Sequence, residues 1–291
     1  MANYILENDH LTATLKAEGA ELTSVRSKAD NQEYIWQADP TVWARHAPVL
    51  FPIVGRLKDN QYQLNGDTYS MGQHGFARDQ SFSVINQSNT EITFGLTASP
   101  ETQKMYPFNF VLDIRYTLQE NELTVAYQVT NQDQATMPFS IGAHPAFYCP
   151  TQQNQQWEEY HLRFEKPETL SRHLLKDGLR NGETEPLLND EDVLALHRQL
   201  FESDAIIFKN VDSDWVRIVR QSDGKPFVTV AFAGFPYLGI WQKVGADFYC
   251  IEPWYGLADT EEGLVDFTEK EGVIKMSPEE QFNAEYQIKF H

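Results

Sequence analysis

Two residues of this chain combine groups capable of proton transfer with a stiff backbone. His144 and Glu252 are each followed directly by a proline, and the residue before a proline is held in extended conformations. An imidazole and a carboxylate placed in this way can act as general acid and general base. Ordinary strand ends show the same pattern, so the prolines alone do not identify a site.

Glu252 stands in a strongly apolar run, residues 248–255. A carboxylate buried there loses its hydration, which raises its pKa and makes it a better base near neutral pH. The alternative is a structural ion pair with an arginine such as Arg56. We favour the catalytic interpretation, because a buried glutamate needs a specific reason to be there.

Two upstream segments carry further candidates. His74 precedes a glycine in residues 73–78, and Arg56 follows a glycine at the end of an apolar run. A loop histidine is more often a solvated or capping group, so His74 becomes a candidate only together with His144 and Glu252. Arg56 either points into a cleft or lies on the surface, and the sequence leaves both open.

Other chemistries have weaker support. His74, His144 and Glu252 could ligate zinc or iron, which we keep as a minority interpretation. The sequence has no Gly-x-Ser-x-Gly turn, no phosphate-binding Gly-Lys-Ser/Thr loop and no His-Glu-x-x-His pair. We therefore expect acid–base chemistry without a metal or another cofactor.

The elements that must position these groups are mostly strands. Apolar residues alternate with polar ones over 108–118, 123–129 and 282–290, which is the period of half-buried strands. We predict an all-β protein, a large twisted antiparallel β-sandwich forming a single domain over 1–291. One or two short helices are expected, one of them within 191–200, and residues 151–159 read as an exposed polar excursion.

Composition limits the partners. The chain has 291 residues and a formal net charge of −19, which disfavours binding to nucleic acid or anionic membranes. No apolar run approaches the ~20 residues of a membrane helix, and no signal peptide is apparent, so a cytoplasmic protein is expected. Cys149 and Cys250 have neither metal-ligand nor redox spacing. Whether they lie close together, and whether the protein is a monomer or homodimer, stays open.

Together these segments resemble the aldose 1-epimerase (galactose mutarotase) family across essentially the whole chain. The resemblance rests on four motifs in the family's order: Gly55-Arg56, His74-Gly75, His144 after a hairpin, and Ile251-Glu252-Pro253. It implies a large twisted β-sandwich that interconverts sugar anomers without a cofactor. The binding partner would be a hexose.

The resemblance also implies residue roles. Glu252 would take the proton of the anomeric hydroxyl, and His144 would protonate the ring oxygen. His74 and Arg56 would hold the ring-oxygen region and hydroxyls, while Asp204 would bind hydroxyls farther round the ring. Aromatic side chains flank these segments, and we expect about two of them to touch the sugar: Trp43, Phe147, Trp241, Trp254 and Tyr255.

The sequence departs from galactose-type enzymes before the histidine and after the glutamate, so their sugar preference is not carried over. Residues 73–78 are instead similar to the glucose-6-phosphate 1-epimerase branch. That similarity implies that Gln73, Arg78 and Arg45 would serve a phosphorylated hexose, although Arg45 stands one residue closer to its Pro-x-x-Phe-Pro segment than in that branch. A hexose-6-phosphate epimerase and a non-catalytic carbohydrate-binding protein remain alternatives.

Overall fold

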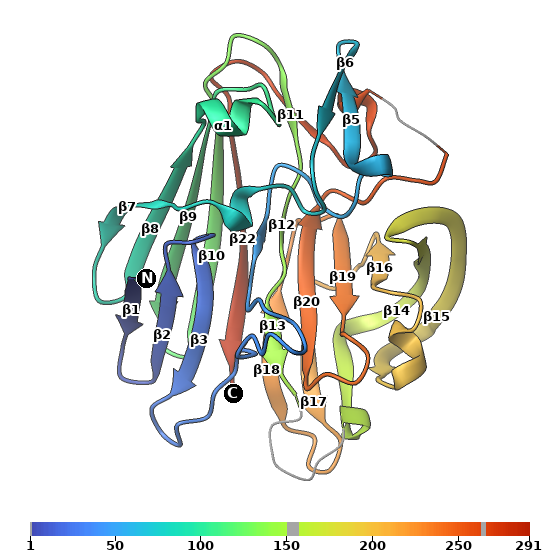
Figure 1. Cartoon of the computed structure of the whole chain (residues 1–291). Coiled ribbons are helices and arrows are strands. Elements are labelled where there is room, and N and C mark those ends of the chain that lie inside the picture. Colours follow the sequence, from blue (N-terminus) through green and yellow to red (C-terminus); the bar gives the residue numbers. More distant parts are fainter. Residues whose placement is uncertain (1, 150–156, 263–265) are drawn as a thin grey trace.

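A computed structural model of the chain describes residues 2–149, 157–262 and 266–291, and its regular secondary structure is almost entirely antiparallel strands (Figure 1). The largest sheet has 15 strands within the described residues. Thirteen of them follow one path, in this order: β4 (Val49–Leu50), β12 (Ile141–Ala143), β20 (Phe248–Tyr255), β19 (Tyr237–Trp241), β16 (Ile206–Lys209), β14 (Tyr160–Lys176), β17 (Trp215–Arg220), β18 (Pro226–Ala231), β22 (Gln281–Phe290), β10 (Glu122–Asn131), β9 (Phe110–Gln119), β8 (Glu91–Thr97) and β7 (Ser83–Gln87).

The remaining strands attach to this sheet or form small ones. β13 (Ala146–Tyr148) pairs with β20, and β15 (Leu179–Ala195) pairs with β14. The smaller sheets combine β1 (Asn3–Glu7), β2 (Leu11–Lys16) and β3 (Glu21–Ser27); β5 (Gln61–Leu64) and β6 (Asp67–Ser70); and β11 (Met137–Phe139) and β21 (Ile274–Met276). The all-β prediction is therefore confirmed.

The alternating segments 108–118 and 123–129 form a long antiparallel hairpin. β9 and β10 pair antiparallel, with Leu118 opposite Leu123 and Ile114 opposite Tyr127. Their alternate residues are buried, because successive side chains of a strand point to opposite faces. The final strand, β22, pairs with β10 on one side and β18 on the other, so the chain ends inside the large sheet.

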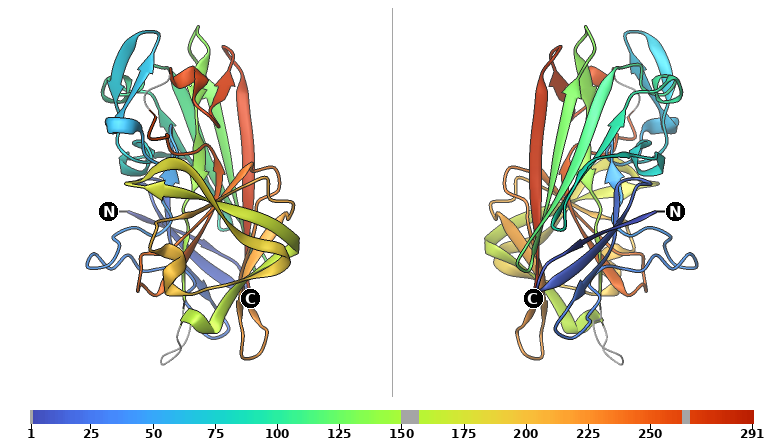
Figure 2. Two further views of the ribbon diagram at one scale, coloured as in Figure 1. Left: turned by 90° about the vertical axis from the view of Figure 1, so that its right-hand side faces the viewer. Right: turned by 90° about the vertical axis from the view of Figure 1, so that its left-hand side faces the viewer.

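The buried face of β8–β10 packs against the three-stranded sheet β1–β3. Tyr4 contacts Phe94 edge to face, with ring centroids 5.4 Å apart. Tyr116 donates a hydrogen bond to the carbonyl of Ala20 over 2.8 Å. Figure 2, right, shows the two layers facing each other. One cluster of buried apolar side chains extends from Leu6 to Phe290.

The helix predicted within 191–200 is wrong for most of its length. β15 runs to Ala195, and only a 3₁₀ turn at Arg198–Phe201 follows. Leu194 and Leu196 are buried whereas Val193 is exposed, which is strand alternation rather than a helical stripe. The α-helix that the described residues do contain, α1 (Pro100–Gln103), was not predicted, and Ser99 caps it.

β14 and β15 form a long hairpin that curls across one side of the molecule (Figure 2, left). Several register shifts interrupt their pairing, and such irregularities bend strands. The predicted excursion at 151–159 falls largely outside the described residues. No helix in the described part of the chain is long and apolar enough to cross a membrane.

Candidate active site

The pairing of three strands brings His144 to Glu252. β12 and β13 both pair with β20, with Gly142 opposite Trp254 and Ala146 opposite Cys250. Continuing this register across the gap between β12 and β13 places residue 144 opposite residue 252. Neighbouring strands lie about 5 Å apart, so the two side chains meet although 108 residues separate them in the sequence.

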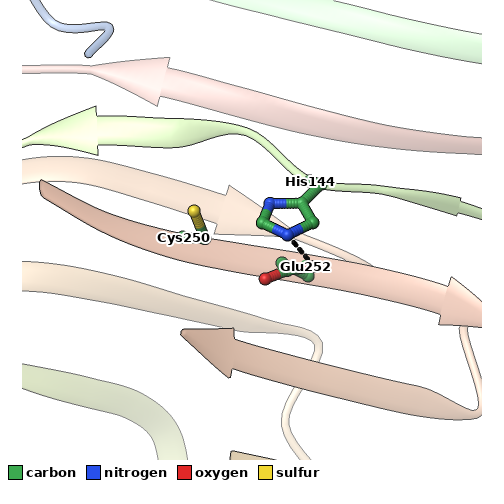
Figure 3. Close-up of side chains that lie close together, drawn as sticks. All are labelled: His144, Cys250 and Glu252. Carbon is green, nitrogen blue, oxygen red and sulfur yellow. Dashed lines mark ion pairs between the residues drawn. The ribbon is translucent and has the colours of Figure 1, made fainter. Parts of the chain in front are cut away.

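His144 and Glu252 form a close buried pair (Figure 3). His144 Nε2 lies 3.4 Å from Glu252 Oε2, and the side chains are 9% and 1% exposed. Neither Glu252 oxygen has a hydrogen-bond partner, and His144 Nδ1 also lacks one. Because buried polar groups are normally satisfied, these atoms are available for a ligand.

Burial shifts both groups toward their neutral forms. It lowers the pKa of His144 to about 3. Burial, with the charge of Asp204 as a second cause, raises the pKa of Glu252 well above its ordinary value. Burial therefore favours the protonated carboxyl group of Glu252 and the neutral imidazole of His144.

His74 lies beside this pair in a fixed tautomer. Its Nδ1 accepts a hydrogen bond from the amide of Gly55 over 3.1 Å, so the proton of the neutral ring sits on Nε2. Burial, followed by the charges of His144 and Arg78, lowers the pKa of His74 well below its ordinary value. His74 is thus a neutral hydrogen-bond donor, with its ring centroid 5.6 Å from that of His144.

The glycine after His74 is required by a close backbone approach. Gly75 has φ +71°, and a Cβ there would lie only 2.2 Å from the carbonyl oxygen of Phe51. Only glycine fits so near another backbone. This contact anchors the loop that presents His74.

Indole rings form walls around the pair. Trp43 stacks on His144 with ring centroids 5.0 Å apart and an interplanar angle of 25°. Trp241 meets the same imidazole edge-on at 5.4 Å, and Trp254 also faces the cavity. Three of the five flanking aromatics therefore line the site, whereas Phe147 is fully buried in the core and Tyr255 lines a different pocket.

These groups enclose a cavity of about 440 Å³, which is large enough for a monosaccharide. It is lined by Trp43, Gly55, Gln73, His74, Arg78, His144, Leu175, Gly178, Asp204, Ala205, Ile207, Trp241, Lys243, Glu252, Trp254 and Ala258. Asp204 stands just before β16 in a left-handed conformation. Six of the eight residues singled out from the sequence are thus brought together.

The arginines of residues 45–78 occupy different places. Arg78 lines the cavity, where its Nη2 donates to the carbonyl of Gln73 over 2.7 Å. Its Nε is buried without a hydrogen-bond partner and lies 3.9 Å from Asp79 Oδ2, and burial followed by the charge of Arg45 lowers the pKa of Arg78 to about 10. Arg45 is not among the lining residues and pairs with Asp79 at 2.8 Å.

Arg56 is the other candidate that the structure leaves outside the lining. Its Nη1 donates to the carbonyl of Asp177 over 3.0 Å, at the turn between β14 and β15. Within the described residues, no ion pair joins it to Glu252, so the structural interpretation of that glutamate gains no support. Arg56 instead holds the hairpin tip whose Gly178 faces the cavity.

Sequence analysis missed Lys243, Leu175 and Gly178. Lys243 follows β19 and donates from Nζ to the carbonyl of Val42, beside Trp43. Leu175 and Gly178 reach the cavity from the tip of the β14–β15 hairpin. No local motif marks these residues, because their positions depend on pairings between distant strands.

The predicted metal-ligand set also differs from the observed cluster. Among the described residues, His144, Cys250 and Glu252 each place a potential ligand atom within 4.8 Å of the others. His74 does not belong to this cluster. Cys149 and Cys250 are both free and buried.

Comparison with known proteins places this geometry in context. Residues 3–265 match the family model described as aldose 1-epimerase. The chain is 34% identical to plasmid-encoded protein LacX of Lactococcus lactis subsp. lactis, and the alignment covers 97% of each protein.

Two solved structures cover essentially the whole chain. A galactose mutarotase related enzyme of Lactobacillus acidophilus is 37% identical, covers 100% of this chain and 97% of its own, and superposes with a TM-score of 0.95. A galactose mutarotase-like protein of Lactobacillus casei is 34% identical with full coverage of both chains and a TM-score of 0.94. These relatives lend no support to the resemblance to the glucose-6-phosphate branch.

Proposed function

The chain belongs to the aldose 1-epimerase family, and we propose that it interconverts the α and β anomers of a hexose at His144 and Glu252. The observation that carries this proposal is the 3.4 Å contact between His144 Nε2 and Glu252 Oε2 on a sugar-sized cavity. Both carboxylate oxygens lack another partner, so a sugar can use them.

Anomer exchange moves one proton off the sugar and another onto it. Glu252 takes the proton of the O1 hydroxyl, and His144 delivers one to the ring oxygen. The bond between C1 and the ring oxygen breaks, and the O1–H electrons form the aldehyde. Rotation about C1–C2 presents the other face, and both transfers then reverse. Each such step contributes about 10²–10⁴ in rate.

Burial favours the protonated carboxyl group of Glu252, so Glu252 must lose that proton before it can act as a base. The mechanism moves it to His144 Nε2, which lies 3.4 Å from Glu252 Oε2, when the sugar binds. The indole face of Trp43, stacked on the imidazole, stabilises the resulting imidazolium. His74 supplies a neutral donor for a sugar oxygen, and Asp204 supplies an acceptor on another part of the wall.

A phosphorylated hexose is the second candidate substrate, and Arg78 favours it. This arginine faces the cavity with a buried Nε that has no hydrogen-bond partner and lies 3.9 Å from Asp79 Oδ2, and Lys243 also lines the wall. Two positively charged side chains at one cavity are unusual in a chain of net charge −19. A guanidinium group is well suited to bind phosphate. Arg45 does not join them, since Asp79 engages it.

Polarimetry with freshly dissolved α-glucose, α-galactose and α-glucose-6-phosphate tests both candidates. We expect the purified protein to speed the decay of optical rotation for at least one of them. Arg78→Gln should reduce kcat/KM for the phosphorylated sugar at least about tenfold more than for a neutral one if phosphate is the natural group. Detectable sugar binding with no acceleration for any aldose would instead indicate a carbohydrate-binding protein.

A further inference from the structure

We propose that His144, Cys250 and Glu252 form a binding site for a zinc-like divalent cation, which blocks the site when it is occupied. One potential ligand atom from each residue lies within 4.8 Å of the other two. Figure 3 shows the three side chains together, with Cys250 and Glu252 on the same strand. The inhibitory part of this inference rests on the proposed function of His144 and Glu252.

Strand geometry explains why the sulfur is there. Cys250 and Glu252 are two residues apart on β20, so their side chains point to the same face. Cys250 pairs with Ala146 of β13, immediately after the segment that carries His144. The third ligand is therefore held by the same register that brings the imidazole to the carboxylate.

The donor set matches the preferences of zinc. Thiolate, imidazole and carboxylate are its usual protein ligands, at about 2.0–2.3 Å in tetrahedral geometry, which puts ligand atoms roughly 3.3–3.8 Å apart. Small side-chain rotations of about 1 Å close the remaining gaps. His144 and Glu252 line the cavity, so the fourth position opens toward it and can take water.

The site holds buried polar atoms without hydrogen-bond partners. Both Glu252 oxygens and His144 Nδ1 lack such partners, although their residues are more than nine-tenths buried. One thiolate and one carboxylate ligand together balance the two positive charges of a divalent cation. This balance matters because the neighbours of Cys250 are apolar, including Trp36, Ala146 and Phe248.

The bound cation excludes catalysis rather than supporting it. It occupies the Nε2 and Oε2 atoms that the proposed mechanism uses for proton transfer. Sugar turnover and metal binding therefore compete, and a chelator restores activity. The inferred role is inhibition by a soft or borderline divalent cation such as Zn²⁺.

Cobalt spectroscopy tests the site without any sugar. Co²⁺ bound to a thiolate has near-ultraviolet charge-transfer absorption, which should appear at one equivalent with the wild type and be displaced by Zn²⁺. Cys149→Ser is the matched control, because that second buried thiol lies outside the cluster, and it should retain the band. Cys250→Ser and Cys250→Ala should both lose it and weaken Zn²⁺ binding at least about 100-fold.

Inhibition is measured separately on whichever aldose turns over. Zn²⁺ should slow anomer exchange by the wild type and by Cys149→Ser, reversibly with EDTA, and should inhibit a folded Cys250 variant at least about 100-fold more weakly. A missing thiolate band, or equal zinc inhibition of a Cys250 variant, overturns the inference. A band in a protein that accelerates no aldose contradicts the proposed function but leaves the metal site standing.

Discussion

Glu21 and Glu252 are both buried glutamates, but their surroundings differ completely. Glu21 is 4% exposed and Glu252 is 1% exposed. Glu21 accepts hydrogen bonds from the amides of His46 and Ala47 over 2.8 and 3.1 Å, and it pairs with Lys16. Glu252 has no hydrogen-bond partner for either oxygen.

The two pKa values move in opposite directions for this reason. Burial raises the pKa of Glu21, but hydrogen bonds from His46 and Lys16 outweigh it and lower the pKa to about 2. For Glu252, the side chain of Trp254 offsets the effect of burial only in part, so the pKa of Glu252 stays well above its ordinary value. A buried carboxylate surrounded by donors is part of the scaffold, whereas one without donors is prepared for a ligand.

The largest expected effect is on catalysis at the unsatisfied carboxylate. Glu252→Gln and His144→Gln should each reduce the anomer exchange rate about 10²–10⁴-fold. Because the two residues act as one acid–base unit in the proposed mechanism, the double variant should be within about tenfold of the slower single variant. Initial rates by polarimetry measure this. Fully additive losses would show that the residues act independently.

The substitutions Glu21→Gln and Glu252→Gln should have different effects on the free energy of unfolding. Glu21→Gln removes a charge that several donors satisfy, so the free energy of unfolding should fall by about 2–4 kcal/mol. Glu252→Gln relieves an unsatisfied buried acid and should leave that free energy unchanged or raise it. Urea unfolding of both variants measures the contrast. A Glu252→Gln protein less stable than Glu21→Gln would reverse our interpretation of the two sites.

The same contrast predicts a dependence on pH. The folded-state pKa of Glu21 lies below its ordinary value of 4.5. The ionised Glu21 side chain therefore adds to the free energy of unfolding above about pH 4.5, and this contribution is lost as pH falls toward 2. That contribution is about 3 kcal/mol. Unfolding free energies at pH 7 and pH 3 should therefore show the wild type converging on Glu21→Gln. If the difference in unfolding free energy between the wild type and Glu21→Gln were the same at both pH values, the charge of Glu21 would not be the source of its stabilising effect.

The smallest expected effect concerns the link between the two regions. Glu21 holds the amides of residues 46 and 47, and Trp43 in the same segment stacks on His144. Trp43→Leu should slow exchange about tenfold, because the imidazolium loses its cation–π contact. Trp43→Phe should retain most of the rate, since it keeps an aromatic face. Equal losses in both variants would indicate a packing role only.

Much of the fold and the pair itself could be predicted from the sequence. Alternation over 108–118 and 123–129 predicted the strands β9 and β10, because period-two patterns are local. The residue types and the family resemblance together predicted His144 and Glu252.

The features that escaped prediction depend on long-range contacts. Lys243 and Gly178 reach the cavity only through the packing of β19 and the β14–β15 hairpin. The false helix within 191–200 arose because four leucine and valine residues fit a helical spacing, while cross-strand pairing with β14 decided the outcome. The approach of Cys250 to His144 and Glu252 likewise has no signature in the local sequence.

The most direct test is exchange spectroscopy by NMR on the anomeric protons of glucose, galactose and glucose-6-phosphate, with wild-type protein and Glu252→Gln. We predict rapid exchange for at least one sugar with the wild type, and exchange near the uncatalysed rate with a fully folded Glu252→Gln protein. Undiminished exchange in that variant, or none with the wild type at concentrations where a sugar binds, would contradict the assignment of Glu252 as the base of a working epimerase.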